Sequence, residues 1–193
     1  MKRVAILFTS GVESTALIEH AIKENVQFDL VHAEYSNKSW NETPHCKNIA
    51  VHYDKEVYTL AVRNDRFNED YPDVHRDVVL WLGYSMGALQ RANYDEVWFG
   101  NHKGEMNDTN SWKMFDAWDI MIELGGMNHT TELKCPLMEL TKHEQWCMIP
   151  DNIKPLCVGC EWLTNDDNDN PILCGKCGKC REWENNNIVI DAS

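Results

Sequence analysis

The sequence predicts an α/β domain, in which helices cover a mostly parallel sheet, followed by a cysteine-rich C-terminal segment. Short apolar runs alternate along the chain with stretches of helical periodicity, and this alternation favours parallel strands joined by right-handed crossovers. Beyond residue 150, Asn, Asp, Gly and Cys dominate and the periodicity ends. Five of the eight cysteines lie between residues 157 and 180. We therefore expect an α/β domain over residues 1–150 and a distinct segment over residues 151–193.

Each element is predicted from apolar alternation for strands or from three- to four-residue spacing for helices. Residues 3–8 form a buried-strand pattern bounded by turn residues, and residues 14–23 are typical of a helix that Ser14 can cap. Thr141 and Glu144 stand in capping-box register at the start of a later helix. The remaining strands are expected at 28–35, 56–62 and 96–99, an extended segment at 135–137, and the remaining helices at 44–53, 74–92, 111–123 and 141–148.

Composition and charge restrict the classes of function. The chain has 193 residues, of which 43% are hydrophobic, and this is enough for a core. Its net charge of −13 argues against a protein whose main task is to coat nucleic acid or an anionic membrane. The apolar runs are too short to cross a bilayer, and the start of the sequence carries no signal-peptide pattern. We therefore expect a soluble cytoplasmic protein. The net charge does not exclude a small anionic ligand, which needs only local donors, and a homodimer is a further expectation.

The turn after the first predicted strand is a candidate anion site. A buried strand, a turn of small residues and a helix start point backbone N–H groups and the helix dipole at a ligand. Ser10 and Gly11 let the backbone come close, and Thr9, Ser14 and Thr15 offer hydroxyl donors. The segment is not a Walker A loop. On the residues alone, the alternative that small polar residues merely close a strand-to-helix turn stays open.

The cysteine spacing predicts a metal site. Cys174, Cys177 and Cys180 follow one another at three-residue intervals with glycines between them. A fourth thiolate, at Cys160 or Cys157, would complete a tetrahedral zinc site, and a shell closed by four thiolates is structural rather than catalytic. Clustered Cys-x-x-Cys pairs without a signal peptide favour metal over disulfides. The alternative is a group of free or redox-active thiols.

A third group of polar residues follows the predicted strand at 96–99. In open α/β sheets the ligand lies outside the carboxyl ends of the strands. Asn101, His102 and Asp108 follow this strand end and can hydrogen-bond a substrate there. The simpler alternative for His102 is an ordinary surface histidine.

The order of these motifs is similar to that of one known family. The segment T-S-G-V-E-S-T at 9–15 aligns without gaps with S-G-G-x-D-S-T. In the middle of the chain, the matches are Pro72 and Arg76 before a long helix, Gly100-Asn101-His102 with Asp108, Pro136-Leu137, and T-K-x-E at 141–144. Near the end, Cys160 is followed by C-G-x-C-x-x-C at 174–180 and by Arg181. Together they resemble 7-cyano-7-deazaguanine synthase of the queuosine pathway, a branch of the PP-loop N-type ATP pyrophosphatases. This chain departs from the pattern at Ser10, where the family has Gly, at Glu13, where it has Asp, and at His75 and Asp77 around Arg76.

The resemblance implies a fold, cofactors and site residues. The fold is the Rossmann-like adenine nucleotide α-hydrolase (PP-loop ATPase) fold, with ATP at the turn, Mg²⁺ at its phosphates and Zn²⁺ at the cysteines. The implied catalytic residues are Ser14, Arg76 and Asp108, and the implied substrate-binding residues are Arg76, Gly100, Asn101, His102 and Asp108. The implied ATP-binding residues are Phe8, Thr9, Ser10, Gly11, Val12, Glu13, Ser14 and Thr15, and the implied metal ligands are Cys160, Cys174, Cys177 and Cys180.

The family's reaction converts 7-carboxy-7-deazaguanine and ammonia to the nitrile at the expense of ATP. The carboxylate becomes an acyl adenylate, ammonia displaces AMP to give an amide, and a second activation allows dehydration. Three alternatives stay open for this chain. The first is an enzyme that stops at the amide. The second is a tRNA-thiolation enzyme, which the net charge argues against. The third is an inactive, zinc-stapled binding module, which the departures at Ser10 and Glu13 favour.

Overall fold

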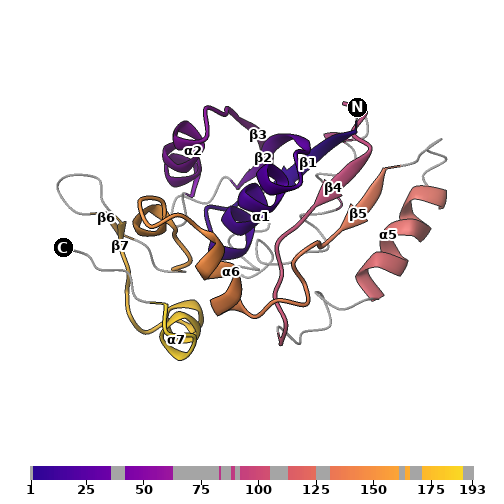
Figure 1. Cartoon of the computed structure of the whole chain (residues 1–193). Helices are drawn as coiled ribbons and strands as arrows, with labels where there is room; N and C mark the ends of the chain where they lie inside the picture. The colour runs from indigo at the N-terminus through magenta and orange to yellow at the C-terminus, as the bar shows by residue number, and fades with distance from the viewer. Residues whose placement is uncertain are drawn as a thin grey trace.

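The core of the molecule is a five-stranded parallel sheet with strand order β3-β2-β1-β4-β5 (Figure 1). The computed structural model describes residues 2–35, 42–62, 83, 88–89, 92–104, 113–124, 131–160, 164–165 and 171–188. The strands are β1 (Arg3–Leu7), β2 (Gln27–Tyr35), β3 (Val57–Val62), β4 (Glu96–Trp98) and β5 (Glu132–Lys134). All four neighbouring pairs are parallel. The predicted α/β class is confirmed.

Helices pack on both faces of the sheet, so β1 is buried on both sides. Val4 and Ile6 belong to one apolar cluster with side chains of α1, α2 and α6, whereas Ala5 and Leu7 belong to a second cluster with Trp118 of α5. This alternation follows from the two-residue period of a strand. Among the described residues, the helices with assigned bounds are α1 (Val12–Lys23), α2 (Thr43–His52), α5 (Lys113–Leu124), α6 (Lys142–Met148) and α7 (Gly178–Asn185).

The C-terminal segment packs against the first of these clusters. It contains the short 3-10 helix η3 (Lys154–Leu156), the antiparallel hairpin of β6 (Thr164–Asn165) and β7 (Pro171–Ile172), and α7. Cys157 and Trp183 are buried in the same cluster as α1. The boundary at residue 150 stays a prediction. In the described part of the chain, no helix is both long and apolar enough to span a membrane.

The structure corrects two local predictions and confirms a third. Helix α1 begins at Val12 with Gly11 as its N-cap, so Ser14 lies inside the first turn and does not cap it. The segment expected to be extended at 135–137 runs into a turn at Pro136, and strand β5 comes just before it, because proline has no N–H for the ladder. The capping box of Thr141 and Glu144 is present at the start of α6. The helix predicted at 74–92 lies mostly outside the described residues.

The strand order places a topological switch point at the carboxyl ends of β1 and β4. Chain connections leave β1 toward β2 on one side, and β4 lies on its other side, so the strand order reverses between them. Ligands of open α/β sheets bind at this switch point. Gly100, just after β4, meets the first turn of α1 so closely that a Cβ there would lie 2.7 Å from Cβ of Glu13 and 2.9 Å from the Ser14 nitrogen.

Substituting Gly100→Ala should therefore destabilise the protein. The added methyl group meets backbone atoms, which cannot give way cheaply, and overpacking of this kind costs about 1–3 kcal/mol. Urea unfolding measures the loss. Gly83→Ala is the matched control, because a Cβ at Gly83 has nothing within 4 Å and should leave stability unchanged or slightly raised. Equal stability of the Gly100→Ala protein and the wild type would contradict the close approach.

Candidate functional site

Residues 8–15 connect β1 to α1 at the switch point and are here called the phosphate turn, after the anion site that the sequence predicts there. Ser10 has a φ of +57°, in the left-handed region, and its hydroxyl donates to Thr9 O at 2.6 Å. Ser10 thus adopts the backbone that glycine favours, at the position where the resembling family has Gly. Gly11 then caps α1 without a side-chain hydrogen bond. The first amides of a helix have no intrahelical partner, so the turn offers N–H donors and a positive dipole end to an anion.

The hydroxyl groups of the turn hold its own backbone. Ser14 Oγ accepts from Thr9 N at 3.2 Å and donates to Gly11 O at 3.3 Å, and Thr9 Oγ1 lies 3.3 Å from it. Ser10, Ser14 and Thr15 are buried, as are Phe8 and Val12. The candidate ATP-binding residues are therefore gathered in one turn, where an anion would meet mainly backbone amides and the half-buried Thr9.

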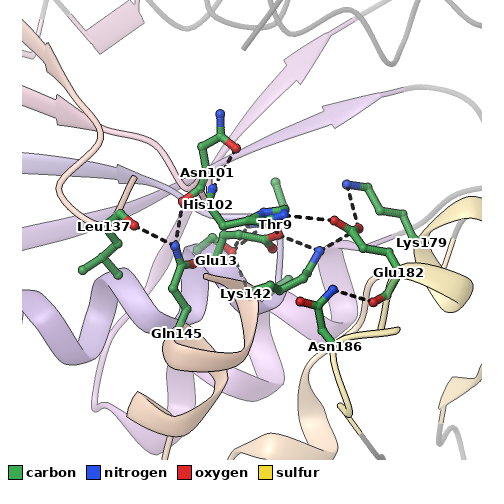
Figure 2. Close-up of polar contacts among 12 residues, drawn as sticks. Thr9, Glu13, Asn101, His102, Leu137, Lys142, Gln145, Lys179, Glu182 and Asn186 are labelled. Atoms are coloured by element: carbon green, nitrogen blue, oxygen red, sulfur yellow. Dashed lines mark hydrogen bonds and ion pairs between the residues drawn. The ribbon is translucent and has the colours of Figure 1, made fainter. Parts of the chain in front are cut away.

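Glu13 belongs to a partly buried ion-pair network that ties the turn to α6 and α7 (Figure 2). Its Oε1 lies 2.7 Å from Lys142 Nζ and 3.2 Å from His102 Nδ1. On the opposite side, Glu182 lies 2.8 Å from Lys142 Nζ and 3.2 Å from His102 Nε2. Figure 2 shows both carboxylates turned toward Lys142 and His102. Lys179 Nζ is 3.5 Å from Glu182.

This network keeps Glu13 ionised and compensates its charge. Burial alone would raise the pKa of Glu13, but the charge of Lys142 and the hydrogen bond with His102 outweigh it and lower the pKa below its ordinary value of 4.5. Burial likewise opposes ionisation of Glu182, yet His102 and Lys142 lower its pKa to about 2. Lys142, with a side chain only 1% exposed, needs these carboxylates, because a buried ammonium without partners is costly. The carboxylate of Glu13 therefore does not present a free negative charge to an anion at the turn.

The segment after β4 is held by α6. Gln145 Nε2 donates to Asn101 O at 2.7 Å and to Leu137 O at 2.9 Å, and Asn101 Oδ1 accepts from His102 N at 2.8 Å. Asn101 and His102 are both buried. They lie beside the phosphate turn as predicted from the strand end, with Gly100 serving there as the close contact with α1. The predicted site residues Arg76 and Asp108 lie outside the described residues.

Three residues of this site were not among the predicted site residues. Lys142 stands in the T-K-x-E segment, whose match to the family pattern was the available signal for it. Gln145 and Glu182 carry no such signal, because their roles arise from contacts with residues 44 and 40 positions away in the sequence.

The described part of the chain gathers four cysteines into one cluster, here called the cysteine cluster: Cys160, Cys174, Cys177 and Cys180. Their sulfur atoms all lie within 4.8 Å of one another, and Sγ of Cys174 and Cys180 are 3.9 Å apart. A tetrahedral site with metal–sulfur bonds of about 2.3 Å has sulfur–sulfur edges of about 3.8 Å, so these thiols fit Zn²⁺. Cys157, the other candidate for the fourth ligand, lies in the apolar core instead, where burial raises the pKa of its thiol to about 12.

Backbone N–H groups point at the sulfurs of the cluster. Cys174 N donates to Cys160 Sγ at 3.3 Å, Cys177 N to Cys174 Sγ at 3.3 Å, and Cys180 N to Cys177 Sγ at 3.4 Å. Donation from the backbone of Lys176 is the main cause that lowers the pKa of Cys174 to about 6. Gly175 has a φ of +69°, the left-handed turn that a metal knuckle needs. These donors favour the thiolate of Cys174, whereas burial and the neighbouring thiols raise the pKa of Cys180.

Comparison with known proteins yields structural likeness only. No family model and no curated protein matches the chain. Similar solved structures include a 4-thiouridine synthetase–RNA complex with bound ATP (14% identity, TM-score 0.49), a predicted subunit of tRNA methyltransferase from Methanocaldococcus jannaschii (14%, 0.42) and NMN synthetase from Francisella tularensis (13%, 0.47). The matches cover 75%, 72% and 86% of this chain, and 39%, 69% and 70% of the others. This chain therefore spans well under half of the thiouridine synthetase, and at these scores the likenesses add nothing to what the residues show.

Acid should destabilise the protein through Glu13. Because the pKa of Glu13 is lowered in the folded state, its ion pairs contribute fully above pH 4.5 and are lost progressively as the pH falls below that value. Glu13→Gln should cost about 2 kcal/mol at neutral pH, the usual loss for a hydrogen bond to a charged group, and should weaken the acid dependence. Urea unfolding between about pH 7 and about pH 3 measures both.

The control for this prediction is Glu24→Gln, an exposed change at the C-terminal end of the same helix. It should alter neither the neutral stability nor the acid dependence. If Glu13→Gln unfolds with the same free energy as the wild type at neutral pH, the network does not stabilise the turn.

Replacing one thiol of the cysteine cluster should release the metal. Cys177→Ser removes a thiolate, and because metal binding contributes to folding, the unfolding free energy should fall by about 3 kcal/mol at saturating zinc. Metal content by mass spectrometry under native conditions and thermal unfolding are the measurements. Cys147→Ser is the control, since Cys147 is exposed and lies outside the cluster. Unchanged zinc content together with unchanged thermal unfolding in Cys177→Ser would contradict the assignment of the cluster as a metal site.

Proposed function

We propose that this protein is an ATP-dependent ligase that activates a carboxylate as an acyl adenylate. The observation that carries the proposal is the phosphate turn itself. Helix α1 begins there without a side-chain cap, beside the switch point of the sheet, and Ser10 holds the left-handed backbone conformation at the glycine position of the PP-loop pattern. A helix start of this kind suits the phosphates of a nucleotide.

The local charges are balanced and so do not oppose a triphosphate, although the whole chain is acidic. Lys142 balances Glu13 within the first turn of α1, and Lys142, Lys179 and His102 surround the carboxylate of Glu182. Mg²⁺ would be bound mainly through the phosphates, as is usual for this ion. When bound, it would neutralise phosphate charge; the residues of the turn would bind and orient the nucleotide.

The chemistry needs a leaving group rather than a strong base. A carboxylate resists attack by ammonia, whereas an acyl adenylate does not, because AMP leaves readily. The protein then has to hold the carboxylate in line with the α-phosphate and to stabilise the charge that develops, and positioning and electrostatics carry most of such catalysis. Asn101 and His102 lie beside the turn and would contact the acid, and Arg76 and Asp108 are proposed for the same task.

The proposed substrate is 7-carboxy-7-deazaguanine, with ammonia as the second reactant and the nitrile as the product. The order of the motifs along the chain supports this substrate, and the cysteine cluster at the end of the chain has the spacing that the resembling family carries. The cluster would hold a structural Zn²⁺, since its four thiols close the coordination shell.

The direct test is incubation with ATP, Mg²⁺, ammonium and 7-carboxy-7-deazaguanine, followed by mass spectrometry. We expect AMP, pyrophosphate and the nitrile, which is one water lighter than the amide. Amide alone would assign an enzyme that stops after the first activation. If AMP and pyrophosphate do not form, the ligase proposal is wrong and an inactive binding module is the better description.

Ser14→Ala tests the turn within this proposal. The hydroxyl of Ser14 holds Thr9 N and Gly11 O, so its loss should loosen the phosphate site and lower kcat/KM for ATP by about 10-fold, the equivalent of about one neutral hydrogen bond. Thr164→Ala, an exposed change in the C-terminal hairpin, is the control. Wild-type kinetics in Ser14→Ala, with ATP turned over, would remove this side chain from the mechanism.

A further inference from the structure

Helix α7 joins the cysteine cluster to the phosphate turn, and we propose that Glu182 is the positioning residue through which metal binding at the cluster holds the turn in place. The inference depends on the proposed function only where it treats the turn as a nucleotide site. It makes a structural metal a condition for an ordered phosphate site.

The N-terminal end of α7 carries part of the cysteine cluster. Cys177 is the N-cap of this helix, its Sγ accepts from Cys180 N, and its carbonyl accepts from Arg181 N at 3.1 Å. Two of the four thiols of the cluster therefore lie in the first turn of α7. A bound metal would fix where this helix begins and how it is directed, because a structural metal orders the backbone that carries its ligands.

Glu182 connects α7 to the phosphate turn through two shared partners. Glu182 follows Cys180 by two residues and contacts Lys142 and His102, and the same two side chains contact Glu13. Glu182 and Glu13 thus face each other across a shared pair of partners, as Figure 2 shows. Displacement of α7 would take one of the two carboxylates from the buried Lys142. Lys142 and His102 would then be free to shift, and Glu13 with them.

A second connection reaches the other end of the turn. Val158 N donates to Ser10 O at 2.9 Å, and Val158 lies two residues before Cys160. Between them, Gly159 lies against the ring of Trp183 in α7, where a Cβ would come within 2.6 Å of a ring carbon. The cluster is therefore linked to the turn at Ser10 through the backbone and at Glu13 through side chains. Only the side-chain link can be cut without touching a metal ligand or the backbone.

The physical consequence is coupling between two sites. If the metal favours the arrangement that binds nucleotide, the nucleotide must favour metal binding by the same factor. Coupling between protein sites is typically about 5- to 150-fold in affinity. Removing the charge of Glu182 should abolish most of this coupling while the four thiols remain.

Hydrogen exchange measured residue by residue by NMR tests the proposal without any nucleotide. The amides of Thr9, Thr15 and Val158 report on the turn, since each donates a hydrogen bond within it or onto it. In zinc-loaded Glu182→Gln, we expect these amides to exchange at least about tenfold faster than in zinc-loaded wild type, with the amides of β2 unchanged and one zinc retained. Glu184→Gln, an exposed change of the same kind on the same helix, should behave as wild type.

Two results would overturn the proposal. One is that the turn of zinc-loaded Glu182→Gln is as protected as that of the wild type. The other is that β2 is equally deprotected, which would make Glu182 a general stability residue. Because the variant is compared with zinc bound, unfolding of the metal-free protein does not affect either comparison.

Binding of a non-hydrolysable ATP analogue with Mg²⁺ to the zinc-loaded proteins completes the test. We expect the affinity of Glu182→Gln for the analogue to be at least about 5-fold lower than the affinities of wild type and Glu184→Gln. Equal affinities would count against the proposal. If no form binds the analogue, the proposed function is wrong, while the exchange rates still decide whether Glu182 holds the turn.

Discussion

A buried lysine ammonium is the constraint on which the carboxyl edge of this protein depends. Lys142 is almost entirely removed from water, and it is stabilised by Glu13 on one side and Glu182 on the other. A buried charge of this kind is tolerated only while its partners are in place, because its desolvation cost is several kcal/mol. The pairing therefore dictates how α1, α6 and α7 meet. It also compensates the charge of Glu13, which lies in the first turn of α1.

Backbone geometry imposes the second constraint on the same turn. Ser10 adopts a left-handed conformation, and Gly100 lets the end of β4 touch the start of α1. The turn is thus enclosed by its own hydroxyls, by the neighbouring strand and by the backbone N–H of Val158, which donates to Ser10 O. These contacts leave backbone amides as the donors for a ligand. The overall charge of −13 is compatible with phosphate binding because the local balance of charge decides it.

The cysteine cluster imposes a third constraint, which acts on the C-terminal segment. Its ligands come from both ends of a hairpin and from the start of α7, so one metal ion would close a loop of chain and direct a helix toward the site. Structural metal sites are often described as staples for small domains. Such a staple would stand next to a network of five charged or ionisable side chains, so it would bear on the geometry of the turn as well as on stability.

The sequence by itself determined the strands β1 to β4, the helix start at Thr141, the candidate turn and three of the four thiols in the cluster, because each depends on residues close together in the chain. Only the tertiary structure decided that Cys160 rather than Cys157 joins the cluster, and that Glu13 shares Lys142 and His102 with Glu182. Periodicity and spacing describe contacts within a few residues. Contacts between Glu13, His102, Lys142 and Glu182 depend on how the helices pack on the sheet, and local sequence patterns carry no record of that packing.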